Sequence, residues 1–469
     1  MESIQYLQTT AKNTGLYVTT SVLCIHNFLL GFCFVYAGVT MPYHQTGSFG
    51  YILMTEDQIT WYISLNVLMI LVGALVSSPL SEWLGRKRGL ILAHVLHIGS
   101  CIIMLFGYSY SILLVGWLIN GFSAGVGVIL PYTLASEIST IKLRGVLANL
   151  NNLCQNYGML LLYGMNMIIP PQYLLFHGIT LSLLFLLCSP FIVYSPHWLV
   201  RHGKVDEAEK MLRVLRGPDY VGIKHELKEV LAVTDENSNN KSCMKRWTSR
   251  QFLIPLGIIM TMFGSIGLCG IDAPINLYGP SMFAEFGFTI PFQILMLFIP
   301  TGSAVGYTAS VFIAKKLKKK NQFILAASIM AFSAGLISLS YYLKDLSQAE
   351  SFYKLCSQIL FSIGVFGLMS GYGAGYGSVT YTIPGELLAP EDKSIGGASA
   401  ESTRMIVTAI VLKVYPDILD VIGTPIMFMG HALAIILAGL FVFKFLPDTD
   451  DKSISEIQAL FKKKDKELV

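Results

Sequence analysis

The chain has 469 residues, of which 53% are hydrophobic and 13% are charged, and its mean hydropathy is +0.59. Soluble domains carry about 25% charged residues, so this composition excludes an ordinary soluble protein and indicates one that crosses a membrane many times. The formal net charge of +4 says little by itself, and no nucleic-acid partner is expected.

Twelve apolar stretches lie between clusters of charge along the chain. A membrane-spanning helix needs about 20 such residues. In chain order the stretches are 18–40, 60–81, 90–107, 111–135, 146–168, 174–194, 252–284, 291–314, 322–343, 355–385, 394–413 and 423–446. Several exceed the length of one span, which indicates tilt or adjoining re-entrant pieces. The expected fold class is an all-α membrane protein with twelve transmembrane helices.

One long polar insert, residues 195–250, separates six stretches from the six that follow. Its segments "KVDEAEKMLRVLRG" and "GIKHELKEVLAV" place apolar residues three to four apart, which predicts two amphipathic helices. A Gly-Pro pair separates the two segments. The expected organisation is an N-terminal six-helix bundle (1–194), a cytosolic helical linker (195–250), a C-terminal six-helix bundle (251–446) and a cytosolic tail (447–469).

The Lys and Arg residues are distributed unevenly between the two sides of the membrane. If the chain starts inside, all but five of its 33 basic residues fall in cytosolic segments. The five are Lys344, Lys354 and Lys413 outside, and Arg404 and Lys444 within spans. This asymmetry follows the positive-inside rule. We therefore expect a multi-pass membrane protein with both termini in the cytosol. The expected location is the plasma membrane.

The two halves repeat a pattern of charge at their cytosolic ends. "PYTLASEISTIKLRG" closes span four and "TIPGELLAPEDKS" closes span ten, each with a Glu and a cation seven residues later. Paired charges at these depths would lock the cytosolic side shut, whereas simple anchoring by the cations is the alternative. The expected cytosolic gate residues are Glu82, Arg86, Glu137, Arg144, Glu386 and Lys393.

These motifs carry a resemblance to the sugar porter family of the major facilitator superfamily, and within it to the insect facilitated trehalose transporters. "SPLSEWLGRKRG" resembles the family's G-x-L-x-D-R-x-G-R-K loop, and "SPHWLVRHGKVDEAEK" resembles P-E-S-P-R-W-L with the helix after it. "GELLAP" and "LPDTDDKSISEI" resemble E-x-x-P and P-E-T-K-G-x-x-x-x-E-I. The match runs over nearly the whole chain in the right order. The resemblance implies the two-half fold described above.

The chain departs from the family pattern in its cytosolic loops. Glu82 and Trp83 stand where the family has Asp and Arg, and Tyr194 and His197 replace a Glu and an Arg. The second-half loop "KKLKKK" lacks both its acid and its glycine. Because acids are missing, we expect a weaker cytosolic gate and a relatively favoured inward-facing state.

The resemblance implies a central site on spans five, seven, ten and eleven. The span-five Gln falls on Asn152, the span-ten Trp on Tyr381, and the span-eleven Asn on Arg404. The span-seven glutamines are absent from "GSIGLCGID". Amides, hydroxyls and aromatic rings suit the hydroxyls and apolar ring faces of a sugar. The expected substrate-binding residues are Asn152, Gln155, Asp272, Asn276, Tyr278, Tyr381 and Arg404, with Asn156 as a further candidate.

Asp272 is the only charged residue between Arg250 and Glu285. A carboxylate within a span is costly unless it faces a cavity or a partner. We expect it to pair with Arg404, which also lies three residues after Glu401 on one helix face. Two interpretations stay open: a structural ion pair, or contact with an unusual zwitterionic or acidic solute.

The sequence favours facilitated diffusion over proton coupling. Proton-linked relatives carry an Asp on span one and an Arg on span four. Here span one has His26 and Asn27 as its polar residues, and Trp117 stands at the span-four position. Asp272 remains an alternative proton site.

The expected function is a facilitative uniporter that moves a sugar of the trehalose or hexose class by alternating access. The alternatives are a transporter of a different small polar or charged solute and a non-transporting sugar sensor. We expect no enzymatic activity, no cofactor and no metal. The expected partners are the solute and the lipid bilayer, and the protein is expected to be monomeric.

Overall fold

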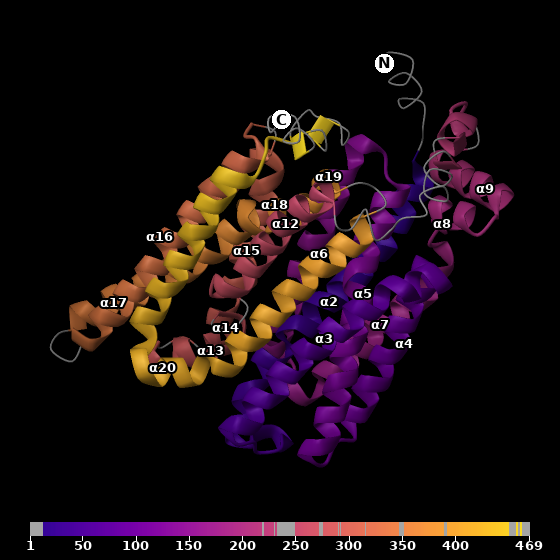
Figure 1. Ribbon diagram of the computed structural model, residues 1–469. Coiled ribbons are helices and arrows are strands. Elements are labelled where there is room, and N and C mark those ends of the chain that lie inside the picture. Colours follow the sequence, from indigo (N-terminus) through magenta and orange to yellow (C-terminus); the bar gives the residue numbers. More distant parts are fainter. Residues whose placement is uncertain are drawn as a thin grey trace.

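The computed structural model describes residues 13–461 except 218–219, 229, 232–248, 272–274, 289, 291, 315, 347–350, 389–391, 450–455 and 458–459. Over these residues the chain is helical, without strands. Figure 1 shows two groups of helices side by side, the N-terminal half in indigo to magenta and the C-terminal half in rose through orange to yellow.

The N-terminal half consists of six long helices that run alternately between the upper and lower faces of Figure 1. The second helix begins with a capping box at Thr55. The Thr55 hydroxyl accepts from the backbone N–H of Gln58, and the backbone N–H of Thr55 donates to the Gln58 side chain. The helices are α2 (Thr14–Thr46), α3 (Glu56–Leu84), α4 (Arg86–Leu105), α5 (Tyr110–Ile138), α6 (Ile141–Ile168) and α7 (Leu174–Cys188).

The insert begins with two short helices at the upper face, α8 (Pro196–Arg201) and α9 (Val205–Arg216). The first predicted amphipathic helix is confirmed by α9. Its last residue, Arg216, is buried, pairs with Glu226 at 2.6 Å and donates to the carbonyl of Ile138 at 3.0 Å. These contacts fasten the insert to the end of α5.

The C-terminal half has more breaks in its helices. Gly423 has φ of 75°, which glycine adopts at little cost, and there the last helix turns back toward the upper face (Figure 1). The elements are α12 (Arg250–Leu268), α13 (Asn276–Glu285), α14 (Phe292–Met296), α15 (Phe298–Ile313), α16 (Lys319–Leu346), α17 (Ser351–Gly371), the π-helix η5 (Tyr372–Tyr376), α18 (Gly377–Thr382), α19 (Pro384–Leu387) and α20 (Lys393–Phe445).

Ten of the described helical segments are long and apolar enough to cross a membrane. One of them, α20, makes two passes because it reverses at Gly423. The polar α6 packs along α2 and completes the N-terminal group. These passes confirm the expected all-α membrane fold with twelve spans.

Glycines bring corresponding helices of the two halves into close contact. A Cβ on Gly121 of α5 would lie 2.5 Å from the carbonyl of Asn66 on α3. A Cβ on Gly373 of η5 would lie 2.5 Å from the carbonyl of Ser303 on α15. The glycines of α5 and of η5 therefore allow close packing of helices. In each half they join the second and fourth spans of that half.

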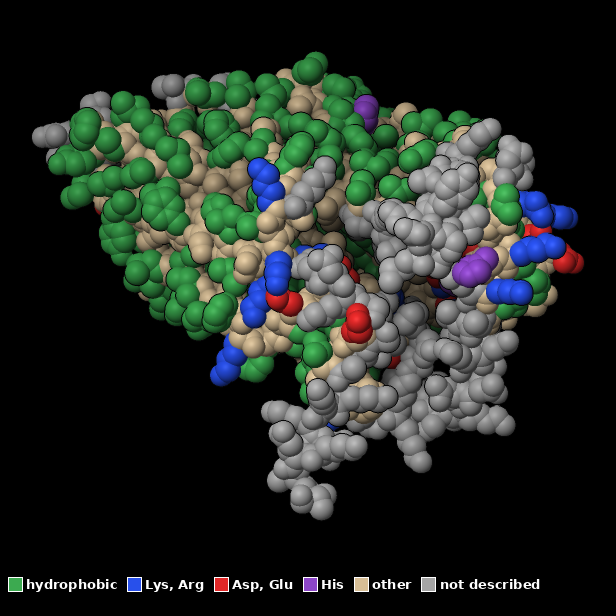
Figure 2. All heavy atoms as spheres, turned by 90° about the horizontal axis from the view of Figure 1, so that it is seen from above, with side chains coloured by type: hydrophobic (Ala, Val, Ile, Leu, Met, Phe, Trp, Pro, Cys, Tyr) green, Lys and Arg blue, Asp and Glu red, His purple; other side chains and the backbone are tan. Residues whose placement is uncertain are grey.

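The surface separates apolar and charged side chains. In Figure 2, the view from above, hydrophobic side chains cover the flank at the left, and charged side chains gather toward the middle and right. On α20 the exposed apolar residues include Leu433, Leu440 and Phe443. Such an exposed apolar surface is typical of contact with lipid, and the charged upper face is typical of contact with water.

Candidate functional site

A cavity with a volume of about 110 Å³ lies between the two halves. Helices α2, α3, α5 and α6 form one wall, and α13, α15, α17, η5, α18 and α20 form the other. Its polar and aromatic lining residues are Phe34, Asn66, Trp117, Asn152, Gln155, Asn156, Asn276, Ser303, Tyr307, Tyr372, Tyr381, Arg404 and Thr408.

Three lining amides come from one face of α6, because Asn152, Gln155 and Asn156 are spaced three and four apart. The hydroxyl of Tyr132 donates to Asn152 Oδ1 at 2.7 Å. Asn156 Nδ2 donates to the carbonyl of Asn152 at 2.9 Å. Tyr132 thus fixes the orientation of the Asn152 amide and leaves its nitrogen directed elsewhere.

Three buried polar atoms on lining residues have no hydrogen-bond partner among the described residues. They are Asn152 Nδ2, Asn276 Oδ1 and Trp117 Nε1. Leaving a buried donor or acceptor unpaired costs about 1–3 kcal/mol, and such groups in folded proteins usually have a partner. Two unpaired donors and one unpaired acceptor therefore belong to residues of the cavity wall.

Aromatic rings of both halves meet beside the cavity. Tyr381 of α18 stacks on Tyr132 of α5, with centroids 6.2 Å apart and planes 12° apart. The edge of Phe263 meets Tyr381 at 5.1 Å. Tyr132 and Tyr381 belong to different halves, so their stack spans the interface between the halves.

Arg404 forms a buried ion pair with Glu401. The Arg404 Nη2 atom lies 2.6 Å from Glu401 Oε1, and the two side chains are 7% and 4% exposed. A buried charge requires such a partner. Asp272 lies outside the described residues, so the predicted Asp272–Arg404 pair stays a prediction.

The cavity gathers five of the residues expected to bind substrate: Asn152, Gln155, Asn276, Tyr381 and Arg404. The expected Tyr278 instead stacks on Tyr415, with centroids 5.1 Å apart.

Several wall residues were not expected from the sequence, and Asn66, Tyr307 and Tyr372 are examples. One signal was available, because Asn66 is the only amide within 60–81. The two tyrosines carry no such signal, since aromatic residues are common in any span.

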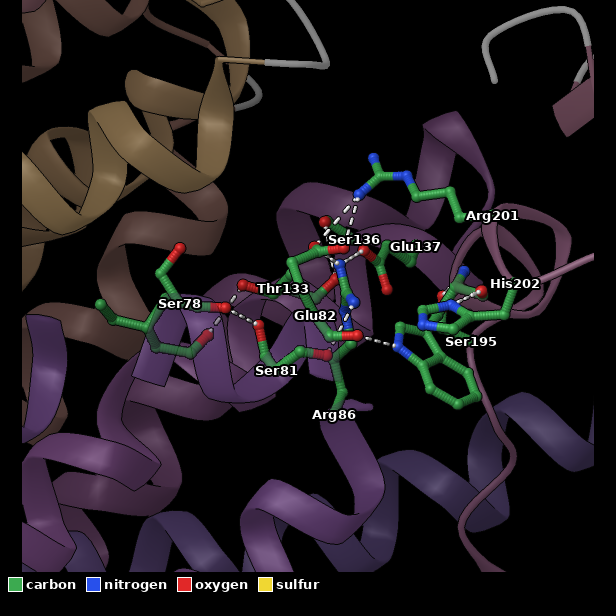
Figure 3. A network of polar contacts seen from close by, with 12 residues as sticks. Ser78, Ser81, Glu82, Arg86, Thr133, Ser136, Glu137, Ser195, Arg201 and His202 are labelled. Atoms are coloured by element: carbon green, nitrogen blue, oxygen red, sulfur yellow. Dashed lines mark hydrogen bonds and ion pairs between the residues drawn. The ribbon is translucent and has the colours of Figure 1, made fainter. Parts of the chain in front are cut away.

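A charge network joins helix ends at the upper face (Figure 3). Arg86 is buried and lies 3.1 Å from Glu82 and 2.8 Å from Glu137. Arg201 of α8 also pairs with Glu82 at 3.1 Å, and the indole of Trp198 donates to the Glu82 carbonyl at 2.8 Å. The network ties α3, α4, α5 and α8 together.

The C-terminal half has a counterpart in Lys319 and Glu386, whose charged atoms are 2.9 Å apart. These ion pairs lie within one half or, for Arg201 and Glu82, join the insert to the N-terminal half. The side chain of Arg144 lies outside the part of the chain that the structure describes, and Lys393 lies at the start of α20. The role of these residues as a gate stays a prediction.

At the lower face one ion pair crosses between the halves. Lys413 of α20 lies 3.1 Å from Asp57 of α3. Its ammonium group also lies 4.4 Å from the ring centroid of Trp61. This contact is a cation–π interaction as well as an ion pair.

The family model for "Sugar (and other) transporter" matches residues 19–461. The facilitated trehalose transporter Tret1 of Polypedilum vanderplanki is 25% identical over 94% of this chain and 88% of its own length. The sugar transporter ERD6-like 6 of Arabidopsis thaliana is 26% identical over 87% of this chain and 83% of its own length.

Solved structures show the same fold. The proton:xylose symporter XylE bound to 6-bromo-6-deoxy-D-glucose has a TM-score of 0.79 at 18% identity, covering 95% of this chain and 98% of XylE. The inward-open form of XylE from E. coli has a TM-score of 0.72 at 19% identity, covering 94% and 98%.

Proposed function

Because this chain belongs to the sugar (and other) transporter family, we propose that it carries a sugar of the trehalose or hexose class down its gradient. The protein is a transporter and not an enzyme. The single observation that carries the substrate class is the central cavity, whose lining residues hold three buried polar atoms without partners among the described residues.

A sugar would satisfy two of these atoms. Its hydroxyls accept from Asn152 Nδ2 and donate to Asn276 Oδ1, while its apolar ring faces pack on Tyr381. Each new neutral hydrogen bond contributes about 0.5–1.5 kcal/mol. Several such bonds together give the modest affinity that a transporter needs in order to release its cargo.

Alternating access supplies the transport mechanism. The two halves rock about the central site, so that the cavity opens to one side at a time. The Tyr132–Tyr381 stack would part on the upper side, and the Lys413–Asp57 pair on the lower side. We assign the upper face to the cytosol because most basic residues of the sequence belong there. The membrane is the plasma membrane, and the unit is a monomer.

Facilitated diffusion is supported by the residues of α2 and α5. No Asp or Glu occurs in Thr14–Thr46, and Trp117 occupies the cavity wall where a cation would be needed for coupling. Transport therefore follows the sugar gradient alone.

A charged solute is the second candidate, because Arg404 lines the cavity. Glu401 neutralises that guanidinium at 2.6 Å, which favours a neutral sugar. Tyr278 of α13 joins the proposed substrate set if the solute reaches its side of that helix, and Asp272 stays a proposed member of the set.

Uptake by purified protein in liposomes tests the function. We expect saturable uptake of labelled trehalose or glucose that stops at equal concentrations on both sides and is insensitive to an uncoupler. A panel of organic anions and zwitterions serves as the comparison. Saturable uptake of one of these without any sugar uptake would replace the proposal, and absence of all uptake with sugar binding retained would indicate a sensor.

A further inference from the structure

The indole of Trp117 is a polar group without an assigned role. The side chain is 2% exposed, its Nε1 atom has no partner among the described residues, and it lies on the cavity wall. Buried tryptophans usually direct their N–H at an acceptor. Because Trp117 belongs to the cavity wall, a molecule bound in the cavity is a source of that acceptor.

Neighbouring rings hold this indole in one orientation. Tyr62 of α3 stacks on it with centroids 5.2 Å apart and planes 9° apart, and Tyr36 of α2 packs at 5.6 Å and 42°. Asn66 Nδ2 also donates to the carbonyl of Trp117 at 2.7 Å, which fixes the backbone of α5 there. The N–H is thus directed before any ligand arrives, which reduces the entropy lost on binding.

Trp117 lies far along the cavity from the tyrosine stack. It precedes Tyr132 by fifteen residues on α5, which corresponds to about 22 Å along a helix. Near Trp117, Ala37 and Ile63 line both this cavity and a second, small pocket that reaches His44. Trp117 therefore marks the end of the cavity nearer the lower, outer face.

We propose that Trp117 is a substrate-positioning residue whose Nε1 donates a hydrogen bond to one hydroxyl oxygen of the transported sugar. Asn66, which also lines the wall, holds Trp117 in place. Together they form an outer subsite that selects sugars with an oxygen at that position. The inference rests on the proposed sugar transport and adds a specificity element to it.

Trp117→Phe removes the donor while keeping an aromatic ring between Tyr36 and Tyr62. We expect KM for the transported sugar to rise roughly three- to tenfold, the effect of one neutral hydrogen bond, with little change in maximal rate. Trp83→Phe is the matched control, because Trp83 is 76% exposed at the end of α3. Its KM should equal that of the wild type.

A series of monodeoxy sugars separates a hydrogen bond from a packing role. For the wild type, removal of the accepting hydroxyl should raise KM by the same three- to tenfold factor. For Trp117→Phe that analogue and the parent sugar should have equal KM values, because the bond is already lost. If Trp117→Phe weakens every analogue by the same factor, or leaves all KM values unchanged, the subsite is overturned while sugar transport stands.

Two further outcomes are informative. If Trp117→Phe does not reach the membrane folded, Trp117 is replaced by benzothienylalanine, which keeps the indole shape but lacks the N–H, and the same series is measured. If the wild type neither binds nor transports any sugar of the series, the proposed function fails and the subsite fails with it.

Discussion

At the scale of single residues, Asn152 is the amide on which sugar affinity should depend most. Asn152→Ala removes the unpartnered Nδ2 and leaves the Tyr132 hydroxyl without its acceptor. We expect KM to rise about tenfold or more, since a lost bond and a stranded donor each cost about 1 kcal/mol or more. Asn166→Ala is the control, because Asn166 lies on the same helix and accepts a hydrogen bond from Tyr43 at 3.2 Å. It should change stability but not KM. Equal effects of the two variants on KM would contradict a role of Asn152 in binding. The measurement is uptake kinetics in liposomes.

Removing one partner of the buried ion pair between Glu401 and Arg404 should lower the stability of the protein strongly. Glu401→Ala leaves Arg404 buried with reduced compensation, and breaking a buried pair costs about 3–5 kcal/mol. Glu207→Ala is the control, because Lys204 and Glu207 have the same i, i+3 spacing at 3.3 Å but are about half exposed, and exposed pairs contribute about 0–1 kcal/mol. Unfolding in detergent measures both. Similar losses for the two variants would refute the difference.

At the scale of elements, sequence hydropathy predicted the spans because the bilayer imposes their length. It predicted 394–413 and 423–446 as separate helices, and Gly423 is the point at which α20 reverses. It did not reveal the role of Trp117, since its orientation depends on Tyr36 and Tyr62 from two other helices. The resemblance aligned Asn152 and Tyr381 with the site, yet their contact through Tyr132 arises only when α5, α6 and α18 meet.

The close contact of η5 with α15 should tolerate no added atom. A Cβ on Gly373 would lie 2.5 Å from the Ser303 carbonyl and 2.6 Å from the Tyr307 amide, both rigid backbone atoms. Gly373→Ala should therefore lower the melting temperature and uptake together, by displacing Tyr307 and Tyr372 from the cavity wall. A Cβ on Gly335 of α16 would meet no atom of the described residues within 4 Å, so Gly335→Ala should be neutral. A fully active Gly373→Ala would show that η5 shifts freely.

At the scale of the whole molecule, the named ion pairs divide into two kinds. Those of Arg86 and Lys319 at the upper face join residues within one half, so they stabilise each half as a unit. The pair of Lys413 and Asp57 joins the two halves at the lower face, so it acts on the equilibrium between conformations. Its free energy favours states in which α3 and α20 meet at their lower ends.

Breaking the Lys413–Asp57 pair should therefore shift the population toward states open at the lower face. The pair is 36% and 75% exposed, so its ionic part contributes about 0–1 kcal/mol, and the contact with Trp61 adds about 0.5–1 kcal/mol. Lys413→Ala should raise the labelling rate of Thr408→Cys, a cavity position, by a membrane-impermeant maleimide about two- to tenfold. Exchanging the charges, Asp57→Lys with Lys413→Asp, should restore slow labelling, and high salt should weaken the difference.

Lys344→Ala is the control. It breaks a 3.0 Å pair with Glu285 within the C-terminal half and should leave the labelling rate unchanged. If it accelerates labelling as much as Lys413→Ala does, loss of surface charge rather than loss of the link between halves governs opening.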